Sequence, residues 1–160
     1  MGRLFLEQQD QTRAAHSPIA ARLGLTAADA RAMNPLQLAY IGDTLHDLYV
    51  RSVLLTHRAS VGAMHRQAVR MVSAAAQAAM LEAITPELTQ EEADVARRGR
   101  NAQAKHAAPR HADPADYAHA TALEALWGYL YLSGQEERLN TLMEAAIGRT
   151  EALWHRQSSR

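Results

Sequence analysis

Long apolar, helix-forming runs, separated by helix-start and helix-stop signals, constrain the fold of this chain most strongly. The run from Asn34-Pro35 to about Leu55 is apolar almost all round, and Asn and Pro are a typical N-cap and first helical residue. Alanine and leucine are abundant, aromatic residues make up only 5%, and the β-branched runs that mark strands are scarce. The sequence therefore predicts an all-α fold with a central, buried helix over residues 34–55.

Further helices are predicted between the remaining signals. The expected ranges are 18–33 (in one or two pieces), 60–84, 89–98, 113–133 and 135–157. Thr26 with Asp29, and Thr89 with Glu92, have the spacing of capping pairs. Residues 99–111 are expected to form a flexible basic loop.

The length of 160 residues suits one domain rather than two. We expect a polar N-terminal leader with a short helix at 1–33 and a helical domain at 34–147. The end of the last helix and a tail follow at 148–160. No internal repeat interrupts this order.

Composition excludes several classes of protein. No cysteine is present, so disulfides and thiolate metal sites are excluded, which fits a cytoplasmic protein. No stretch reaches the roughly 18 apolar residues of a membrane span, and the first residues lack the apolar core of a signal peptide, so no membrane partner is expected. The 17 basic and 17 acidic residues balance, so nucleic-acid binding would depend on a local basic segment.

Asp43 and Glu124 are the acidic residues that the helix pattern leaves unexplained. Each lies inside an apolar helical run near a glycine, Gly42 in the first case and Gly128 in the second. A buried, unpaired carboxylate costs on the order of several kcal/mol. The sequence therefore predicts that the two helices cross at these glycines and that the two carboxylates share a cation. Two carboxylates completed by water suit Mg²⁺.

Other interpretations of these acids stay open. The two acids can instead be independent structural groups, each paired with an arginine such as Arg51, Arg66 or Arg70. Asp47 lies one helical turn after Asp43 on the same face. It can form a helix-surface ion pair with Arg51, or it can support a metal site through a hydrogen bond or a bound water.

A local basic segment follows the acidic stretch at residues 82–94. The residues that we expect to contact a nucleic-acid backbone are Arg97, Arg98, Arg100, Asn101 and Lys105. Arginine binds phosphate through two hydrogen bonds, and asparagine can reach 2′-hydroxyl groups. A solvated basic loop without a ligand is the alternative.

Five sequence blocks resemble the ribonuclease III family. Residues 39–43 (AYIGD), followed by 49–51 (YVR), are similar to the signature helix of ribonuclease III endonuclease domains. The blocks 72–78 (VSAAAQA), 97–102 (RRGRNA) and 121–132 (TALEALWGYLYL) are similar to Mini-ribonuclease III, the compact subclass without a C-terminal double-stranded-RNA-binding domain. The five blocks stand in the family's order and span most of the chain.

The resemblance implies an all-α endonuclease domain that forms a homodimer, with an RNA duplex lying in a valley along the dimer. It implies Mg²⁺-dependent hydrolysis of double-stranded RNA, with Mn²⁺ as a substitute metal and with 5′-phosphate and 3′-hydroxyl products. In the Mini subclass the usual task is the maturation of the large-subunit (23S) ribosomal RNA precursor. A ribosomal protein is an additional expected partner.

Carried over residue by residue, Asp43 and Glu124 match the family's metal-binding aspartate and glutamate, and both are expected to be catalytic. Full-length relatives carry two more acids, at positions held here by Ala39 and Thr121. The resemblance therefore implies a thinner acidic shell with more water around the metal. Thr121 and Asp47 are the candidates for a supporting role outside the metal's ligand shell, although the subclass more often has Glu at the position of Asp47, so the resemblance does not itself support a role for that residue.

Two rival functions are consistent with the same residues. A non-catalytic RNA-binding or ribosome-assembly protein on the same fold would explain the two missing acids. If the chain is instead a helical protein-interaction module, both remaining acids have structural roles. The first rival predicts RNA binding without metal-dependent cleavage. The second predicts no RNA binding, and Asp43→Asn would then change only stability.

Overall fold

The computed structural model describes residues 18–155, and every regular element in this range is a helix. The helices are α2 (Pro18–Arg22), α3 (Ala27–Ala32), α4 (Pro35–Leu55), α5 (Val61–Met71), α6 (Ala74–Ile84), the 3₁₀ turn η1 (Thr85–Glu87), α7 (Gln90–Ala104), α8 (Pro114–Leu132) and α9 (Glu136–His155). The all-α prediction is confirmed. The parts of the expected leader and tail at residues 1–17 and 156–160 lie outside the described residues.

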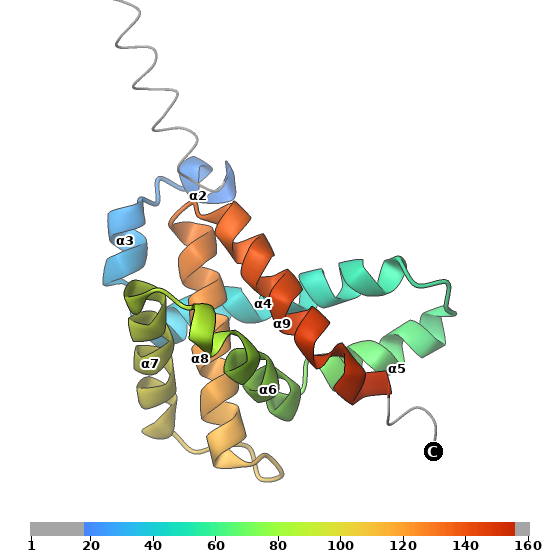
Figure 1. Ribbon diagram of the computed structural model, residues 1–160. Coiled ribbons are helices and arrows are strands. Elements are labelled where there is room, and N and C mark those ends of the chain that lie inside the picture. Colours follow the sequence, from blue (N-terminus) through green and yellow to red (C-terminus); the bar gives the residue numbers. More distant parts are fainter. Residues whose placement is uncertain (1–17, 156–160) are drawn as a thin grey trace, which may run out of the picture.

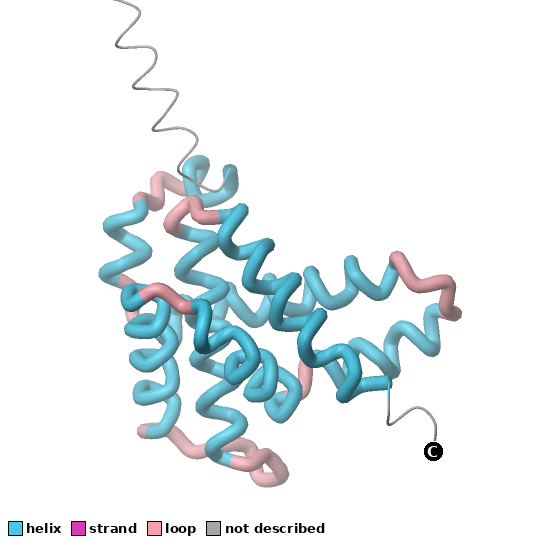
Figure 2. The backbone as a smooth tube through the Cα atoms, in the orientation of Figure 1, coloured by secondary structure: helices cyan, strands magenta, loops and turns pink. Residues whose placement is uncertain are grey.

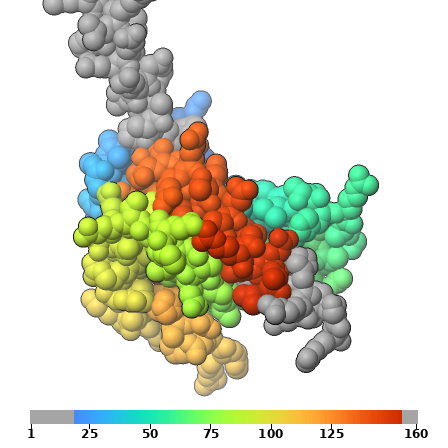
Figure 3. Space-filling view, viewed as in Figure 1, coloured from blue at the N-terminus to red at the C-terminus, as the bar shows by residue number. Residues whose placement is uncertain are grey.

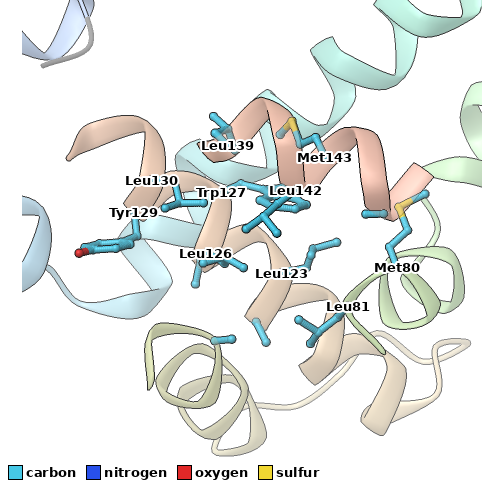
Figure 4. Packing of buried hydrophobic residues seen from close by; sticks show 14 of the residues in the cluster. Met80, Leu81, Leu123, Leu126, Trp127, Tyr129, Leu130, Leu139, Leu142 and Met143 are labelled. Carbon is cyan, nitrogen blue, oxygen red and sulfur yellow. The ribbon is translucent and has the colours of Figure 1, made fainter. Parts of the chain in front are cut away.

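Helix α8 is the centre of the fold. It packs against α4, α6, α7 and α9, and Figure 1 shows it running through the middle of the molecule. Its Leu123, Leu126 and Trp127 have no exposed surface, and Figure 4 shows them among side chains from α6 and α9. A helix enclosed by neighbours on several sides must be apolar almost all round, as the sequence of α8 is.

Glycines let α4 and α8 approach each other closely. A Cβ atom on Gly42 of α4 would overlap with the backbone carbonyl of Glu124, and a Cβ atom on Gly128 of α8 would overlap with the carbonyl of Leu38. Because backbone atoms cannot move aside as a flexible side chain can, these two positions exclude larger residues. The predicted crossing of the two helices at these glycines is confirmed.

Helix α4 is less buried than its sequence suggests. Its C-terminal half and α5 form a hairpin that extends from the body of the molecule (Figures 1 and 2). Tyr40, Leu48 and Leu55 are exposed, and Tyr40 keeps 86% of its accessible surface. The prediction of a helix buried on all sides was therefore wrong, since one chain supplies neighbours to only one side of α4.

The predicted helix over 60–84 is two helices. Ser73 ends the first because its side chain donates to the carbonyl of Arg70 (2.8 Å) and accepts from the backbone N–H of Ala76 (3.2 Å), which caps α6. Serine favours such capping geometry over a helix interior. The break lets α6 turn to pack against α8 while α5 stays on α4.

Helix α7 continues through the region predicted to be a flexible loop. It ends at Ala104 rather than near Arg98, and Gly99 is buried inside it. A Cβ atom on Gly99 would lie 2.9 Å from Cβ of Ala125 and 3.1 Å from Cα of Ala122 on α8. Contact with α8 therefore holds a glycine in a helix that it would disfavour by about 1 kcal/mol in isolation.

His46 joins α4 to α5 and α8. Its Nδ1 accepts a hydrogen bond from Nε1 of Trp127 (3.3 Å), so its Nε2 carries the proton and donates to the carbonyl of Met71 (3.1 Å). Burial lowers the pKa of His46. The ring is therefore a neutral structural link one helical turn from Asp43.

The remaining elements complete the body. The space-filling view shows α9 across one face, with α6 and α7 on one side and the α4–α5 hairpin on the other (Figure 3). The capping boxes at Thr26–Asp29 and Thr89–Glu92 are confirmed. Among residues 18–155 no helix combines the length and the apolarity needed to cross a membrane.

Candidate active site

The carboxylates of Asp43 and Glu124 belong to the α4–α8 crossing. Asp43 directly follows Gly42, whose backbone lies against the backbone of Glu124. The negative charge of Asp43 is close enough to act on Glu124: burial raises the pKa of Glu124 to about 7, and the charge of Asp43 adds to the rise. Two acids that lie 81 positions apart in the chain therefore interact electrostatically.

The two acids differ in their exposure. Asp43 is exposed, so the expectation that it is a buried acid in an apolar helix was wrong. Glu124 is partly buried, and no basic group contributes to its pKa within the described part of the chain. Burial thus disfavours the ionised form of Glu124, and the nearby negative charge of Asp43 disfavours it further.

Gln77 of α6 is the third side chain at this crossing, and the sequence analysis did not assign it to the site. Its Nε2 donates to Oε1 of Glu124 over 3.1 Å. Gln77 is buried, with 3% of its surface exposed. A single polar residue in the alanine-rich run of α6 was the signal available in the sequence, because a buried amide needs a polar partner.

The two residues expected to support the site have other partners. Nε of Arg51 donates to both carboxylate oxygens of Asp47, at 3.0 and 2.9 Å, so the helix-surface ion pair that the sequence left open does form. The hydroxyl of Thr121 donates to the carbonyl of Tyr117 in its own helix (3.0 Å). Neither residue contacts Asp43 or Glu124 through these bonds.

The basic segment is presented on a helix rather than on a loop. Arg97, Arg100, Asn101 and Lys105 are exposed, and their three- and four-residue spacing places them along one side of α7 and its C-cap. Arg97 also pairs with Asp94 over 3.2 Å on the helix surface.

A groove of about 580 Å³ lies between α6, α7 and α8, with Arg97 and Arg100 among its lining residues. Arg98 points elsewhere: it is half-buried, and its guanidinium donates to the carbonyl of Met33 (3.2 Å). The segment therefore divides into an exposed basic side and one arginine that holds α7 against the end of α3.

Comparison with known proteins identifies the family of the chain. The family model of the Ribonuclease III domain matches residues 36–135. The chain belongs to the ribonuclease III family. Its ribonuclease III domain thus contains Asp43, Gln77, the exposed basic side of α7 and Glu124.

Relatives place the chain in the Mini-ribonuclease III branch of the family. It is 52% identical over 120 residues to Mini-ribonuclease 3 of Symbiobacterium thermophilum, covering 74% of this chain and 92% of that protein. It is 44% identical over 124 residues to Mini-ribonuclease 3 of Brevibacillus brevis, covering 77% and 92%. The resemblance predicted from the sequence blocks is confirmed, and the chain is grouped with ribonuclease III-type endoribonucleases.

A solved structure supports the fold. The crystal structure of a protein from Fusobacterium nucleatum matches with a TM-score of 0.67 at 28% identity, covering 75% of this chain and 96% of that chain. The ribonuclease III domain fold predicted from the sequence is confirmed.

The residues at the α4–α8 crossing fit a hydrated divalent cation, the type of metal on which ribonuclease III enzymes generally depend. The charge of Asp43 acts on Glu124, no basic group of the described residues does so, and oxygen ligands are those that Mg²⁺ prefers. Across residues 18–155 no group of three or more histidines and acids could hold a metal. Water would therefore have to fill most of the coordination positions, as the missing acids at Ala39 and Thr121 imply.

Proposed function

We propose that this chain is a Mg²⁺-dependent endoribonuclease that hydrolyses phosphodiester bonds of double-stranded RNA, with Asp43 and Glu124 as metal ligands and catalytic residues and Mn²⁺ as a substitute metal. The observation that carries the proposal is the close α4–α8 crossing at Gly42, which brings the charge of Asp43 close to the partly buried Glu124; burial and that charge raise the pKa of Glu124 to about 7. A structural acid would be placed beside a cation of the protein, whereas this acid is placed beside another acid.

The electrostatics at the crossing favour a divalent cation. Without one, Glu124 holds its proton up to about pH 7, because its ionised form is partly buried and repelled by Asp43. A cation between the two groups would favour the ionised form, so metal binding should release a proton. When bound, Mg²⁺ would supply Lewis-acid polarisation of the scissile phosphate and a water of lowered pKa. Asp43 and Glu124 would hold it at the helix crossing.

The RNA backbone is proposed to lie along the exposed side of α7. Arg97, Arg100, Asn101 and Lys105 would contact phosphates and 2′-hydroxyl groups, which suits recognition of an A-form duplex by shape. Arg98 was predicted to join them, but its hydrogen bond to Met33 assigns it to packing in this proposal. Since the chain has no net charge, binding to bare duplex should be weak and should weaken further with salt.

A homodimer is proposed on the face of α4 that one chain leaves open. Tyr40 is 86% exposed beside an apolar hollow of about 710 Å³ that Ile19, Leu23 and Tyr40 help to line. Exposed apolar residues grouped around a hollow are typical of an association surface. In a dimer with twofold symmetry, each copy would present the same Tyr40 ring and the same apolar hollow to the other copy.

The cellular task is proposed from the family resemblance. Maturation of the large-subunit (23S) ribosomal RNA precursor in the cytoplasm would supply a structured duplex, and a ribosomal protein could present it. The exposed basic side of α7 is short and the chain has no net charge, so help from substrate structure or from a partner is expected.

A non-catalytic RNA-binding or ribosome-assembly protein on the same fold is the alternative. The observation that favours it is the small number of acids at the site, since Ala39 and Thr121 stand where two further acids would strengthen metal binding. This alternative requires RNA binding without cleavage in any divalent metal.

One experiment separates the two functions. Purified protein is incubated with duplex and single-stranded RNA in Mg²⁺, Mn²⁺ or EDTA, and the product ends are mapped. We expect duplex-specific, metal-dependent cleavage with 5′-phosphate ends, and a loss on the order of 10³-fold for Asp43→Asn and Glu124→Gln with binding retained. Glu144→Gln, an exposed change on α9, is the matched control and should cleave normally. Binding without cleavage in both metals would favour the alternative.

A further inference from the structure

The side chain of Gln77 is buried in the first turns of α6, where a polar group needs hydrogen-bond partners. It is surrounded in sequence by alanines and lies within hydrogen-bond distance of Glu124 on α8. Only 3% of Gln77 is exposed, so water from the bulk solvent does not satisfy its amide. Its hydrogen bonds therefore have to be accounted for within the site.

The orientation of this amide is fixed by its partners. Nε2 lies 3.1 Å from Oε1 of Glu124 and 3.2 Å from the carbonyl oxygen of Val72. The carbonyl of Val72 can only accept a hydrogen bond, which fixes the position of Nε2, and the same nitrogen donates to Oε1 of Glu124. The NH₂ group of Gln77 must therefore face both of them, and both of its protons are used.

The other half of the amide is left without a partner. Oε1 of Gln77 is buried and accepts no hydrogen bond from any described residue. A buried acceptor in this state destabilises the folded protein, so it marks a place where a donor is missing. The orphaned oxygen belongs to the same planar group that holds Glu124, which places the missing donor beside the two-carboxylate site.

We infer that Gln77 is a positioning residue for this site: its N–H holds one oxygen of Glu124, and its carbonyl oxygen accepts a hydrogen bond from a water in the cation's hydration shell. The inference rests on the proposed metal-dependent function. The bond to Oε1 fixes the direction of the carboxylate and leaves its second oxygen for the cation. Because the site has few acids, it relies on water, and an outer acceptor that orients such a water raises metal affinity.

A purely structural role would have different consequences. In that case Gln77 would serve only to bond the carbonyl of Val72, which the break between α5 and α6 has freed. Its replacement would then change stability and leave metal binding unchanged. The positioning role predicts the reverse: metal affinity and turnover change while stability changes little, because the same replacement also removes a buried, unsatisfied oxygen.

The test uses Gln77→Met, which keeps the length and volume of the side chain and removes its hydrogen bonds. Gln67→Met on α5 is the matched control, since Gln67 is partly buried and outside the site. Mn²⁺ binding without RNA is measured by calorimetry, thermal unfolding is measured without metal, and cleavage of duplex RNA gives kcat and KM. We expect Gln77→Met to weaken Mn²⁺ binding and to lower kcat by about 10- to 100-fold. KM for RNA should not change, and Tm should stay within about 4 °C of wild type.

Three results would overturn the inference. Unchanged Mn²⁺ affinity and kcat in a folded Gln77→Met protein leave the proposed nuclease intact and reject the role of Gln77 alone. A large fall in Tm with unchanged Mn²⁺ affinity assigns Gln77 to structure. A wild type that neither binds Mn²⁺ nor cleaves RNA rejects the metal site and the role of Gln77 with it. If Gln77→Met does not fold, Gln77→Asn decides by the same measurements, since its shorter amide cannot reach both Glu124 and Val72.

Discussion

Two glutamates on neighbouring helices, Glu92 and Glu124, have opposite surroundings. The carboxylate of Glu92, at the start of α7, accepts hydrogen bonds from the guanidinium of Arg138 (2.8 and 3.0 Å) and from the backbone N–H of Thr89 (2.9 Å). Burial by itself raises the pKa of Glu92, but these hydrogen bonds outweigh it, and the net pKa is lowered. Glu124 on α8 has a neutral amide and another acid as neighbours, and its pKa is raised to about 7.

The difference separates an acid whose ionised form stabilises the fold from an acid whose ionised form the fold disfavours. Arg138 joins α9 to α7 through Glu92, so that carboxylate contributes to stability in its ionised form. At Glu124 the ionised form is disfavoured by the protein alone. A site that keeps a partly buried carboxylate without a cationic partner is a candidate for a cation that enters from solution.

The largest expected effect comes from placing a side chain at the close contact between α4 and α8. Gly42→Ala places a methyl group on the backbone carbonyl of Glu124, which cannot move aside. We expect a loss of about 3 kcal/mol in the free energy of unfolding and loss of metal-dependent cleavage, because Asp43 moves away from Glu124. Urea unfolding and a cleavage assay measure the two effects.

Gly148 on α9 provides the control for this change. A Cβ atom there would meet nothing within 4 Å, so Gly148→Ala should keep activity and gain up to about 1 kcal/mol of stability. If Gly42→Ala behaves like Gly148→Ala, the crossing is not as close as the structure describes.

The comparison of the two glutamates can be tested directly by neutralising each in metal-free protein. At pH 7, Glu124→Gln should raise the free energy of unfolding by about 2 kcal/mol, because the unfolded chain ionises near pH 4.5 while the folded site holds its proton up to about pH 7. The stability that protonated Glu124 contributes is fully present below about pH 4.5 and is lost as pH rises towards 7. The gain of the variant should therefore disappear when urea unfolding is repeated near pH 4.5.

Glu92→Gln should act in the opposite direction. At pH 7 it should lower the free energy of unfolding by about 2 kcal/mol, because hydrogen bonds from a cation to a buried carboxylate are lost. The contribution of Glu92 is present above its unfolded pKa and declines as pH falls through its lowered folded pKa. Equal signs for the two variants at pH 7 would contradict the contrast between the two sites.

The smallest expected effect is at Asp47. Its ion pair with Arg51 is exposed, with 43% and 58% of the two side chains accessible, so Asp47→Asn should change stability by less than about 0.5 kcal/mol. Cleavage should change by less than about threefold. A strong fall in metal-dependent activity would instead restore the supporting role that the sequence left open for Asp47.

Local signals made much of the fold predictable. Asn34 and Thr89 cap their helices as expected, since each cap is a hydrogen bond within three residues of the chain. The break at Ser73 and the continuation of α7 through Gly99 were missed. Both depend on how α6 and α7 pack on α8, and no short stretch of sequence contains that information.

The same distinction applies to the candidate site. Asp43 and Glu124 could be found as isolated acids beside glycines, and their meeting could be predicted from that pattern. The exposure of Asp43, the turning of Arg98 to Met33 and the contact between Gln77 and Glu124 could not. Each depends on which helix face lies opposite.

The sequence by itself determined the helices, their caps, the two glycines that permit a close crossing and the family of the chain. These follow from interactions within a few residues, or from matching residues in order. The tertiary structure alone decided which acid is partly buried, which is exposed, and which neutral side chain donates a hydrogen bond to the partly buried one. The physical reason is that the pKa of a carboxylate and its hydrogen-bond partners are set by atoms that the fold brings together from distant parts of the chain.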